Sequence, residues 1–246
     1  MFGIFNRKCS LKESGLLHVI QDRHSHIMYG VDDGVKTYEE SSDIFAWLSG
    51  NGLKSLWLTP HVMEDIPNSS ESLSVRFSGM VQSLGHGAVL HLAAEYMMDN
   101  LFVQRLESGD LLCMEDNMVL METSVWESPS NFTGMLEDTM RAGFWPVLAH
   151  PERYRYMDMA DYGRLREMGV RLQLNLPSMI GMYGEHVQKK ARGMLYEGMY
   201  SFVGSDCHNF NMYRKLYTAK ELKKKDVELI AALCRHGADA AADNRI

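Results

Sequence analysis

Residues 22–34 read DRHSHIMYGVDDG, with two histidines two positions apart followed by two adjacent aspartates. On a β-strand, residues i and i+2 share a face, so His24 and His26 would aim both imidazoles at one point. Neutral imidazole is a common ligand of zinc, iron and manganese, and carboxylate suits the harder of these ions. The stretch therefore indicates a metal site, although two satisfied histidines beside a solvated acidic turn give the same local pattern.

The composition is that of a folded chain rather than a disordered one. The 246 residues are 46% hydrophobic and 23% charged, which fits one large α/β domain or two small ones. The net charge is −7, and the densest basic segment is only KELKKK at 220–225, so nucleic-acid binding is disfavoured. Because no linker or repeat divides the chain, we expect one domain over 1–246, with 1–15 as a flexible N-terminal extension.

The cellular compartment follows from the termini and the cysteines. No apolar run approaches the length of a membrane span, and MFGIFNRKCS at the N-terminus has no signal-peptide core. The cysteines are far apart and form no CxxC pair; they are Cys9, Cys113, Cys207 and Cys234. They indicate reduced thiols, so we expect a cytoplasmic protein with no membrane span.

Short apolar segments alternate with helix-like segments along the chain. We expect strands at 16–20, 53–58, 88–96, 117–123, 144–150, 170–176 and 200–208. Helices are expected at 37–52, 70–84, 128–143, 161–169, 183–197 and 214–240. This alternation predicts an α/β fold with a parallel sheet, open or closed into a barrel. Right-handed crossovers place all strand C-termini on one face, where barrel enzymes carry their chemistry.

Imidazoles and carboxylates gather where these strands end. They are His24, His26, His61, Glu95, Glu122, His150, Asp206 and His208. Core residues would favour strand middles, and solvated charges would favour helix faces. A gathering of this kind at six strand ends points to a multi-metal centre.

Six motifs carry a family resemblance. They are HSHIMYGVDDG at 24–34, TPH at 59–61, AAE at 93–95, MET at 121–123, AHPERY at 149–154 and GSDCHN at 204–209. In this order they resemble the PHP (polymerase and histidinol phosphatase) superfamily, and within it the bacterial protein-tyrosine phosphatases encoded with capsule and exopolysaccharide genes. The resemblance spans residues 17–214. It implies a distorted (β/α)7 barrel with the metal site at the C-terminal ends of the strands.

The resemblance also implies the metal ligands. They are His24, His26, Asp33, His61, Glu95, Glu122, His150, Asp206 and His208. The implied grouping puts His24, His26 and Asp206 on one ion, and Asp33, His61 and His208 on a second. Glu95, Glu122 and His150 would bridge or complete a third. We expect two or three ions, with Mn favoured by the resemblance and Fe or Zn also suited to such ligands. Asp22 and Asp32 flank the motif and suit positions behind the histidines.

Two arginines are candidates for binding the phosphoryl group. Arg153 matches its motif, HPERY, directly. The family often places another phosphate-binding arginine after GSDCHN, and Arg214 lies near that place but one residue out of register. The chain also departs from the family pattern at Arg23 and Tyr29. Because Arg23 faces away from the ligands, we expect it to be exposed.

The resemblance implies a metal-dependent, cysteine-independent phosphatase acting on phosphotyrosine in proteins. Its implied partner is a bacterial tyrosine autokinase of polysaccharide export, with a tyrosine-rich tail. A Cys-x5-Arg nucleophile is disfavoured because Cys207 has Tyr213 at the required offset. Short loops predict an open site, approached past Tyr29, Trp126 and Tyr154.

Three alternatives to this function remain open. The first is a small-molecule phosphatase of the histidinol-phosphate type, although such relatives usually carry larger insertions. The second is a PHP nuclease, which the acidic charge disfavours. The third is an inactive regulatory protein, which would be expected to have lost ligands, whereas every ligand position here holds a competent side chain.

Overall fold

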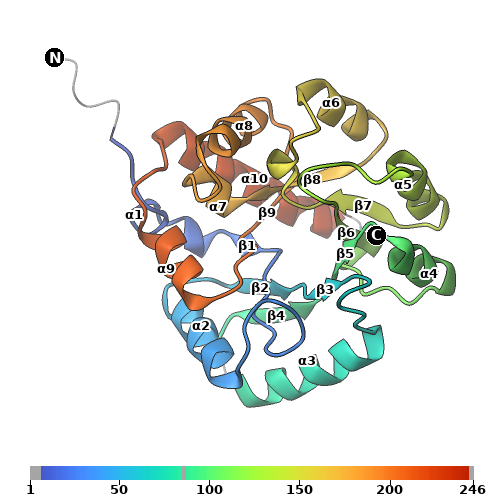
Figure 1. Ribbon diagram of the computed structural model, residues 1–246. Helices are drawn as coiled ribbons and strands as arrows, with labels where there is room; N and C mark the ends of the chain where they lie inside the picture. Colours follow the sequence, from blue (N-terminus) through green and yellow to red (C-terminus); the bar gives the residue numbers. More distant parts are fainter. Residues whose placement is uncertain (1–6, 85–86, 244–246) are drawn as a thin grey trace.

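The computed structural model describes residues 7–84 and 87–243, with side chains described as far as residue 235. Short strands occupy the middle of the molecule, and helices surround them (Figure 1). The strands are β1 (Gln21–Asp22), β2 (Ser55–Leu58), β3 (His61–Val62), β4 (Val89–Leu92), β5 (Glu95–Met97), β6 (Met118–Glu122), β7 (Trp145–Leu148), β8 (Arg171–Asn175) and β9 (Phe202–Gly204). The expectation of an α/β fold built on parallel strands is confirmed.

The strands form two parallel sheets that follow one another around a curl. One has the order β1-β2-β4, and the other has the order β3-β5-β6-β7-β8-β9. Two residues separate β2 from β3 and two separate β4 from β5, so the predicted strand 88–96 divides in two. Beyond β1, the Arg23 amide donates to the Val203 carbonyl (3.2 Å), and Ser25 forms a parallel bridge with Cys207. These contacts bring the first strand beside the last.

The first predicted strand is wrong in its position. Leu16–His18 forms a 3-10 helix, η1, and β1 begins only at Gln21. The helix α1 (Leu11–Ser14) ends at Gly15, which adopts a φ of 71°, so the chain is still turning where the strand was expected. The apolar pair in 16–20 is buried in the core, but a short apolar run cannot by itself distinguish a strand from a helical turn.

The N-terminal segment pairs with a late part of the chain. Residues 1–6 of the expected extension lie outside the described residues. Cys9 and Leu222 exchange backbone hydrogen bonds of 2.8 and 3.0 Å. The Ser10 hydroxyl accepts from the Glu13 amide, and the Glu13 carboxylate accepts from the Ser10 amide, so a capping box starts α1. Leu11 is buried, which fastens this segment to the core.

The helices cover the outside of the strands. They are α2 (Tyr38–Gly50), α3 (Ser70–Leu84), α4 (Asn100–Ser108), α5 (Phe132–Arg141), α6 (Met159–Glu167), α7 (Leu176–Met179), α8 (Glu185–Tyr196), α9 (Phe210–Thr218) and α10 (Lys224–Asp243), with 3-10 turns η2 (Glu115–Asn117) and η3 (Pro151–Arg153). The predicted helix 214–240 is wrong as one element, because α9 and α10 divide it. Within the described part of the chain, no helix is long and apolar enough to cross a membrane.

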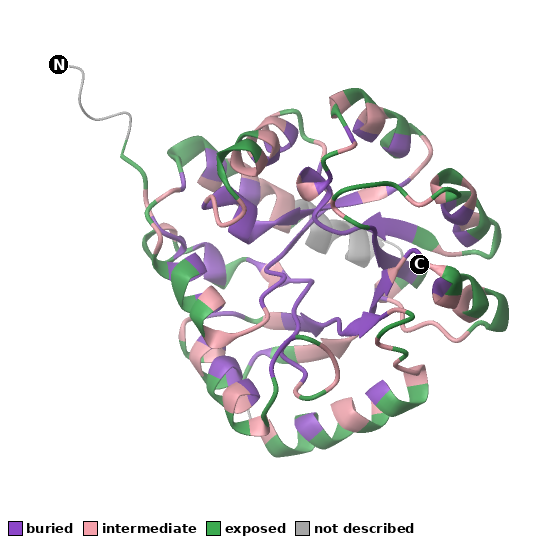
Figure 2. Cartoon of the chain, viewed as in Figure 1, coloured by how far each residue is buried: buried purple, intermediate pink, exposed green. Residues whose placement is uncertain are grey.

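Alternate strand residues face two different apolar clusters. On β6, Val119 and Met121 join the main core with the helices, whereas Met118 and Leu120 join a smaller cluster with residues of β2, β7 and β9. Figure 2 shows the buried strands in the middle and the helices buried along one side. Arg23 extends over Phe202 of the smaller cluster, with its guanidinium 4.7 Å from the ring centroid. The expectation that Arg23 is exposed is therefore wrong.

Candidate metal centre

The two histidines of the opening motif converge as expected. His24 and His26 follow β1 in an extended segment, and their Nε2 atoms lie 3.0 Å apart. Both side chains are buried. Gly34 makes this approach of the loop possible, because a Cβ there would lie 2.1 Å from the His26 carbonyl oxygen. The acidic loop therefore closes back onto the second histidine.

Eight of the nine predicted ligands fall into three overlapping groups whose ligand atoms lie within 4.8 Å of one another. The groups are His24, His26, Glu95 and Asp206; His26, Asp33, His61 and His208; and His61, Glu95 and Glu122. The ninth, His150, lies beside the third group, with Nε2 at 3.0 Å from Glu95 and 3.5 Å from Glu122. The first group is the implied set of His24, His26 and Asp206 with Glu95 added. The second is the implied set of Asp33, His61 and His208 with His26 added.

Glu95 lies at the middle of these groups, at the start of β5. Its Oε2 lies 3.1 Å from His24 Nε2, 3.3 Å from His26 Nε2 and 3.1 Å from His61 Nδ1. This oxygen is buried, yet it has no hydrogen-bond partner among the described residues. Burial favours the neutral acid, but His24 and His61 outweigh it and hold the pKa of Glu95 well below its usual value. A carboxylate oxygen facing three imidazole nitrogens fits a shared metal ligand.

Two ligand candidates lie in strained backbone conformations. His150 after β7 and Asp206 after β9 have φ values of 35° and 49°, which non-glycine residues adopt rarely. Such strain of about 1–3 kcal/mol per residue persists where surrounding contacts enforce it, and it is concentrated at functional sites. Asp206 is held in this way, because its Oδ2 accepts from Arg153 (2.8 Å) and from Asn175 Nδ2 (3.0 Å). Its Oδ1 is left facing His24 and His26, at 3.5 Å from each Nε2.

The open side of the centre is formed by Asp33 and His208. The Asp33 side chain is 64% exposed, and its Oδ1 lies 3.4 Å from Nε2 of both His61 and His208. The contact with His208 outweighs partial burial and lowers the pKa of Asp33 to about 2. The His208 Nδ1 donates to the Asp206 carbonyl (2.9 Å), which turns its Nε2 toward Asp33. A substrate can therefore reach the centre from this side.

Polar side chains behind the histidines fix their orientation. Asp32 Oδ2 accepts from His26 Nδ1 (2.9 Å), as expected for a residue behind a ligand. Gln173 Oε1 accepts from His24 Nδ1 (2.8 Å). Asp22, by contrast, contacts no imidazole: it accepts from the Ser205 amide (2.8 Å) and the Tyr213 hydroxyl (3.3 Å). The bonds to the Nδ1 atoms of His24 and His26 leave the Nε2 atom of each histidine free to face the ligand groups.

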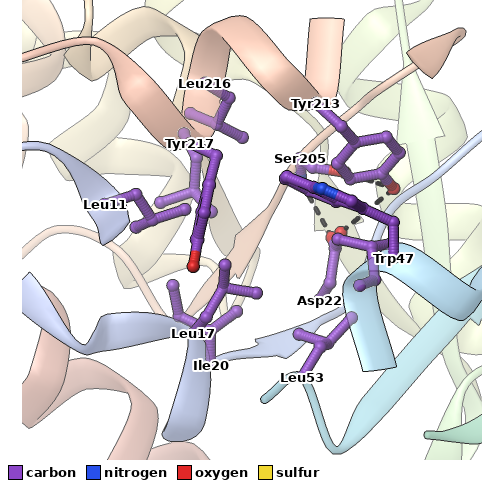
Figure 3. A pocket seen from close by; sticks show the side chains of 12 residues that line it. Leu11, Leu17, Ile20, Asp22, Trp47, Leu53, Ser205, Tyr213, Leu216 and Tyr217 are labelled. Carbon is purple, nitrogen blue, oxygen red and sulfur yellow. Dashed lines mark hydrogen bonds between the residues drawn. The ribbon is translucent and has the colours of Figure 1, made fainter. Parts of the chain in front are cut away.

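Figure 3 shows Asp22 at the wall of a small cavity that Ser205, the residue before Asp206, also lines. The cavity is lined mainly by leucine and aromatic side chains and encloses only about 20 Å³, roughly the space of one water molecule. Burial raises the pKa of Asp22 to about 6, although hydrogen bonds from Ser205 oppose this rise. This cavity is therefore too small for a substrate.

Comparison with known proteins identifies the family. A family model described as "Capsular polysaccharide synthesis, CpsB/CapC" matches residues 20–231. The chain belongs to this family. The membership confirms the resemblance to capsule-type phosphatases that the motifs indicated.

Named relatives of this CpsB/CapC chain are phosphatases. The tyrosine-protein phosphatase CpsB of Streptococcus pneumoniae is 28% identical, covering 84% of this chain and 95% of that protein. The tyrosine-protein phosphatase YwqE of Bacillus subtilis is 25% identical, covering 82% of each. Crystal structures have been solved of YwqE from Bacillus subtilis and CpsB from Streptococcus pneumoniae, described as "unique metal-dependent tyrosine phosphatases". One chain from these structures matches this chain with a TM-score of 0.76 at 20% identity, covering 91% of this chain and 93% of that one. The structural likeness shows a shared fold.

The two candidate arginines of this CpsB/CapC chain lie in different surroundings. Arg153, on η3, donates to Asp206 and lies over the Tyr183 ring, 4.4 Å from its centroid. Arg214, on α9, is exposed, and its guanidinium lies 4.1 Å over the Phe210 ring. Tyr213, at the neighbouring position, is turned inward toward Ser205. Arg153 is thus beside the ligand groups, whereas no hydrogen bond or ion pair of its side chain within residues 7–84 and 87–235 joins Arg214 to them.

Sequence reasoning missed three residues that hold this site. Gln173 supports His24, and Asn175 and Tyr183 both contact Asp206 Oδ2, Tyr183 at 3.5 Å. A signal was present, because Gln173 and Asn175 are polar residues at i and i+2 in the apolar strand VRLQLNL. Tyr154 was expected to line the approach, but it is buried, with its ring 5.8 Å from that of His150.

Proposed function

We propose that this chain is a metal-dependent phosphatase that hydrolyses phosphotyrosine in proteins. The observation that carries the proposal is the convergence of three imidazole nitrogens on Glu95 Oε2, a buried oxygen with no hydrogen-bond partner among the described residues. Family membership supports the same activity, because CpsB and YwqE are named tyrosine-protein phosphatases. The natural substrate would be a phosphotyrosine-bearing kinase tail in the cytoplasm.

The fold that we propose is a single-domain, distorted (β/α)7 barrel. If β2 with β3 and β4 with β5 each count as one interrupted strand, the strands described here number seven. The contacts between Arg23 and Val203 and between Ser25 and Cys207 support closure of the first strand onto the last. In this arrangement the ligand groups lie toward the C-terminal ends of the strands, which suits a barrel enzyme.

The donor set fits two or three divalent ions. His24, His26, Glu95 and Asp206 would hold one ion, and Asp33, His61 and His208 would hold a second, with His26 nearby. Glu95 and Glu122, with His150 beside them, would hold a third. Mixed imidazole and carboxylate donors suit Mn, Fe or Zn, and we favour Mn. Bound ions would supply Lewis acidity toward the phosphoryl oxygens and a water nucleophile active near neutral pH.

The protein side chains would position the phosphoryl group and its leaving oxygen. Arg153 can direct guanidinium donors at the phosphoryl oxygens, because the guanidinium is fixed by Asp206 and by the Tyr183 ring. A histidine or aspartate of the centre would protonate the leaving oxygen. A phenolate leaves more readily than an alkoxide, so tyrosine places the smaller demand on such a group.

The test combines metal analysis with substrate comparison. Purified protein should contain a divalent metal and should show a higher kcat/KM for phosphotyrosine peptides than for matched phosphoserine peptides or histidinol phosphate. Glu95→Gln should lower both the metal affinity and kcat/KM by at least about 100-fold, because the loss of a supporting residue alone costs about 10–100-fold. Glu107→Gln, an exposed change on α4, is the matched control.

Two outcomes would contradict the proposal. Full activity in metal-stripped protein would exclude a metal-dependent reaction. Best turnover of histidinol phosphate would instead assign the chain to small-molecule phosphatases.

A further inference from the structure

A second cavity lies directly beside the metal centre. It encloses about 370 Å³ between the segment Glu152–Arg155 and the start of α8, where Tyr183 and His186 line it. Arg153 belongs to both sites, because it lines this cavity and donates to Asp206 Oδ2. A peptide whose phosphotyrosine enters the metal centre would therefore pass this cavity with its neighbouring residues.

Arg155 and Trp126 form a preorganised pair at the rim of the cavity. The Arg155 guanidinium lies 3.8 Å from the Trp126 ring centroid, and the Trp126 residue is 64% exposed. The Arg155 amide donates to the Val125 carbonyl (2.9 Å), which ties together the loops that follow Glu122 and His150. The pair is thus fixed to the two loops that carry ligand residues.

The Arg155 guanidinium is available to a substrate. It makes no ion pair or side-chain hydrogen bond within residues 7–84 and 87–235, and the residue is exposed. The neighbouring carboxylate of Glu152 is buried and turned inward, where it accepts from the Asn175 amide (3.0 Å) and the Tyr200 hydroxyl (3.1 Å). Arg153 is already paired with Asp206. One unpaired cation stacked on an exposed indole therefore borders the path of the substrate chain.

We propose that Arg155, held flat on Trp126, binds the carboxylate of an aspartate or glutamate that neighbours the phosphotyrosine in the substrate. This inference rests on the proposed phosphatase function and adds a sequence preference to it. A planar guanidinium binds a carboxylate through two parallel hydrogen bonds, and stacking on an indole limits its rotation. A single unpaired cation matches one carboxylate charge. At a partly exposed site the preference should be about 5- to 10-fold in kcat/KM.

The experiment compares matched phosphotyrosine peptides with glutamate or glutamine at each position flanking the phosphotyrosine. Each kcat/KM is divided by that for p-nitrophenyl phosphate, which has no flanking residues, so that a general defect cancels. The metal-loaded wild type should prefer glutamate at one or more positions by about 5- to 10-fold, and Arg155→Ala should remove the preference. Arg166→Ala, at an exposed arginine on α6, should retain it.

Several results would overturn the inference. Equal rates for glutamate and glutamine peptides in the wild type would remove its basis, as would a preference that survives Arg155→Ala. Loss of the preference in Arg76→Ala instead would move the contact to another arginine–aromatic pair, in which the Arg76 guanidinium lies 4.6 Å from the Tyr29 ring centroid. If a second phosphotyrosine raised kcat/KM more than glutamate does, the group bound by Arg155 would be a phosphate and not a carboxylate.

Failure of the phosphatase function itself would be recognised separately. In that case the metal-loaded wild type would hydrolyse neither p-nitrophenyl phosphate nor any phosphotyrosine peptide. Failure of the inference alone would leave both activities present and only the glutamate preference absent.

Discussion

Arg153 and Arg214 can be ranked from their surroundings. The Arg153 side chain is 26% exposed and fixed by Asp206 beside the ligand groups, whereas Arg214 is exposed over Phe210 on α9. Loss of one preorganised donor to a developing charge typically costs about 10²–10³ in rate. We therefore expect Arg153→Ala to lower kcat on a phosphotyrosine peptide by this factor, and Arg214→Ala to lower it much less. An equal or larger loss at Arg214, with metal content unchanged in both variants, would reverse the ranking.

Cys207 lies between residues of the centre but has the wrong properties for a nucleophile. It is fully buried, and burial, reinforced by the nearby Asp22 charge, raises the pKa of its thiol well above the usual value. The thiolate is the reactive form, so this thiol is inert at neutral pH. We expect Cys207→Ser to retain most of the phosphatase activity, measured as kcat on phosphotyrosine peptides. Trapping of a phosphocysteine intermediate by mass spectrometry would contradict this expectation.

At the scale of elements, the close packing of β9 against the centre explains why residue 204 is a glycine. A Cβ at Gly204 would lie 2.5 Å from the His24 Cβ and 2.9 Å from Gln173 Oε1. Gly204→Ala must therefore displace the histidine and its partner, and overpacking of this kind costs about 1–3 kcal/mol. We expect a lower free energy of unfolding in denaturant titrations, together with weaker metal binding.

Gly193 on α8 is the matched control for this change. An added Cβ there meets nothing within 4 Å. Because alanine is the better helix former, Gly193→Ala should be neutral or stabilise the protein by up to about 1 kcal/mol. Similar losses of stability and metal binding in both variants would show that the packing around Gly204 is not responsible.

Some elements could be predicted from their own patterns, but others, such as α4 and the break between α9 and α10, could not. The expected helix 70–84 coincides with α3, and the expected strand 117–123 contains β6. Their periodicity or their unbroken apolar run favours one structure. The two-residue strand β1 was misplaced because its pairing depends on Ser55 and Leu56 of β2, a partner remote in sequence. The four-residue helix α7, which follows β8, was missed because it occupies barely one turn.

The candidate site was more predictable than the elements that hold it. Parallel strands share one C-terminal edge, so residues at strand ends meet even when strand bounds are wrong. Gln173 supports His24 from within β8, and its polar side chain in an apolar strand signals a role without identifying His24 as its partner. The strained φ values of His150 and Asp206 likewise arise from contacts between distant segments. These features depend on tertiary packing, which a linear pattern does not specify.

For the molecule as a whole, metal binding should govern stability. Imidazoles and carboxylates from across the chain meet in the buried centre, so an ion that binds only the folded state stabilises it by mass action. At 100 times the dissociation constant the gain is about 2.7 kcal/mol, which corresponds to a rise in Tm of roughly 5–10 °C for a chain of this size. Chelation should reverse the rise, and Glu107→Gln should retain it, whereas Glu95→Gln should lose most of it.

The stability of the metal-free protein and the gain in stability from metal should depend on pH with opposite signs. Burial and the Arg153 charge lower the pKa of His150, but contacts with Glu122 and Glu95 outweigh them and raise it to about 9 in the metal-free protein. This group therefore contributes stability that is complete below pH 6.5 and is lost as the pH rises through 9. Metal binding requires the neutral imidazole, so each ion competes with a proton, and its affinity grows by up to about tenfold per pH unit over the same window.

Thermal unfolding at pH 6.5, 7.5 and 8.5, with and without a fixed concentration of Mn²⁺, measures both effects. We expect the His150 contribution to lower the Tm of the metal-free protein across this series, while the gain from Mn²⁺ increases. His150→Gln should reduce the metal-free dependence, since it removes one titrating group and keeps a polar side chain, whereas His26 and His61, whose pKa values are also raised, still titrate. A gain from Mn²⁺ that is independent of pH would mean that no imidazole of the centre gives up a proton to the ion, which is incompatible with His150 acting as a ligand.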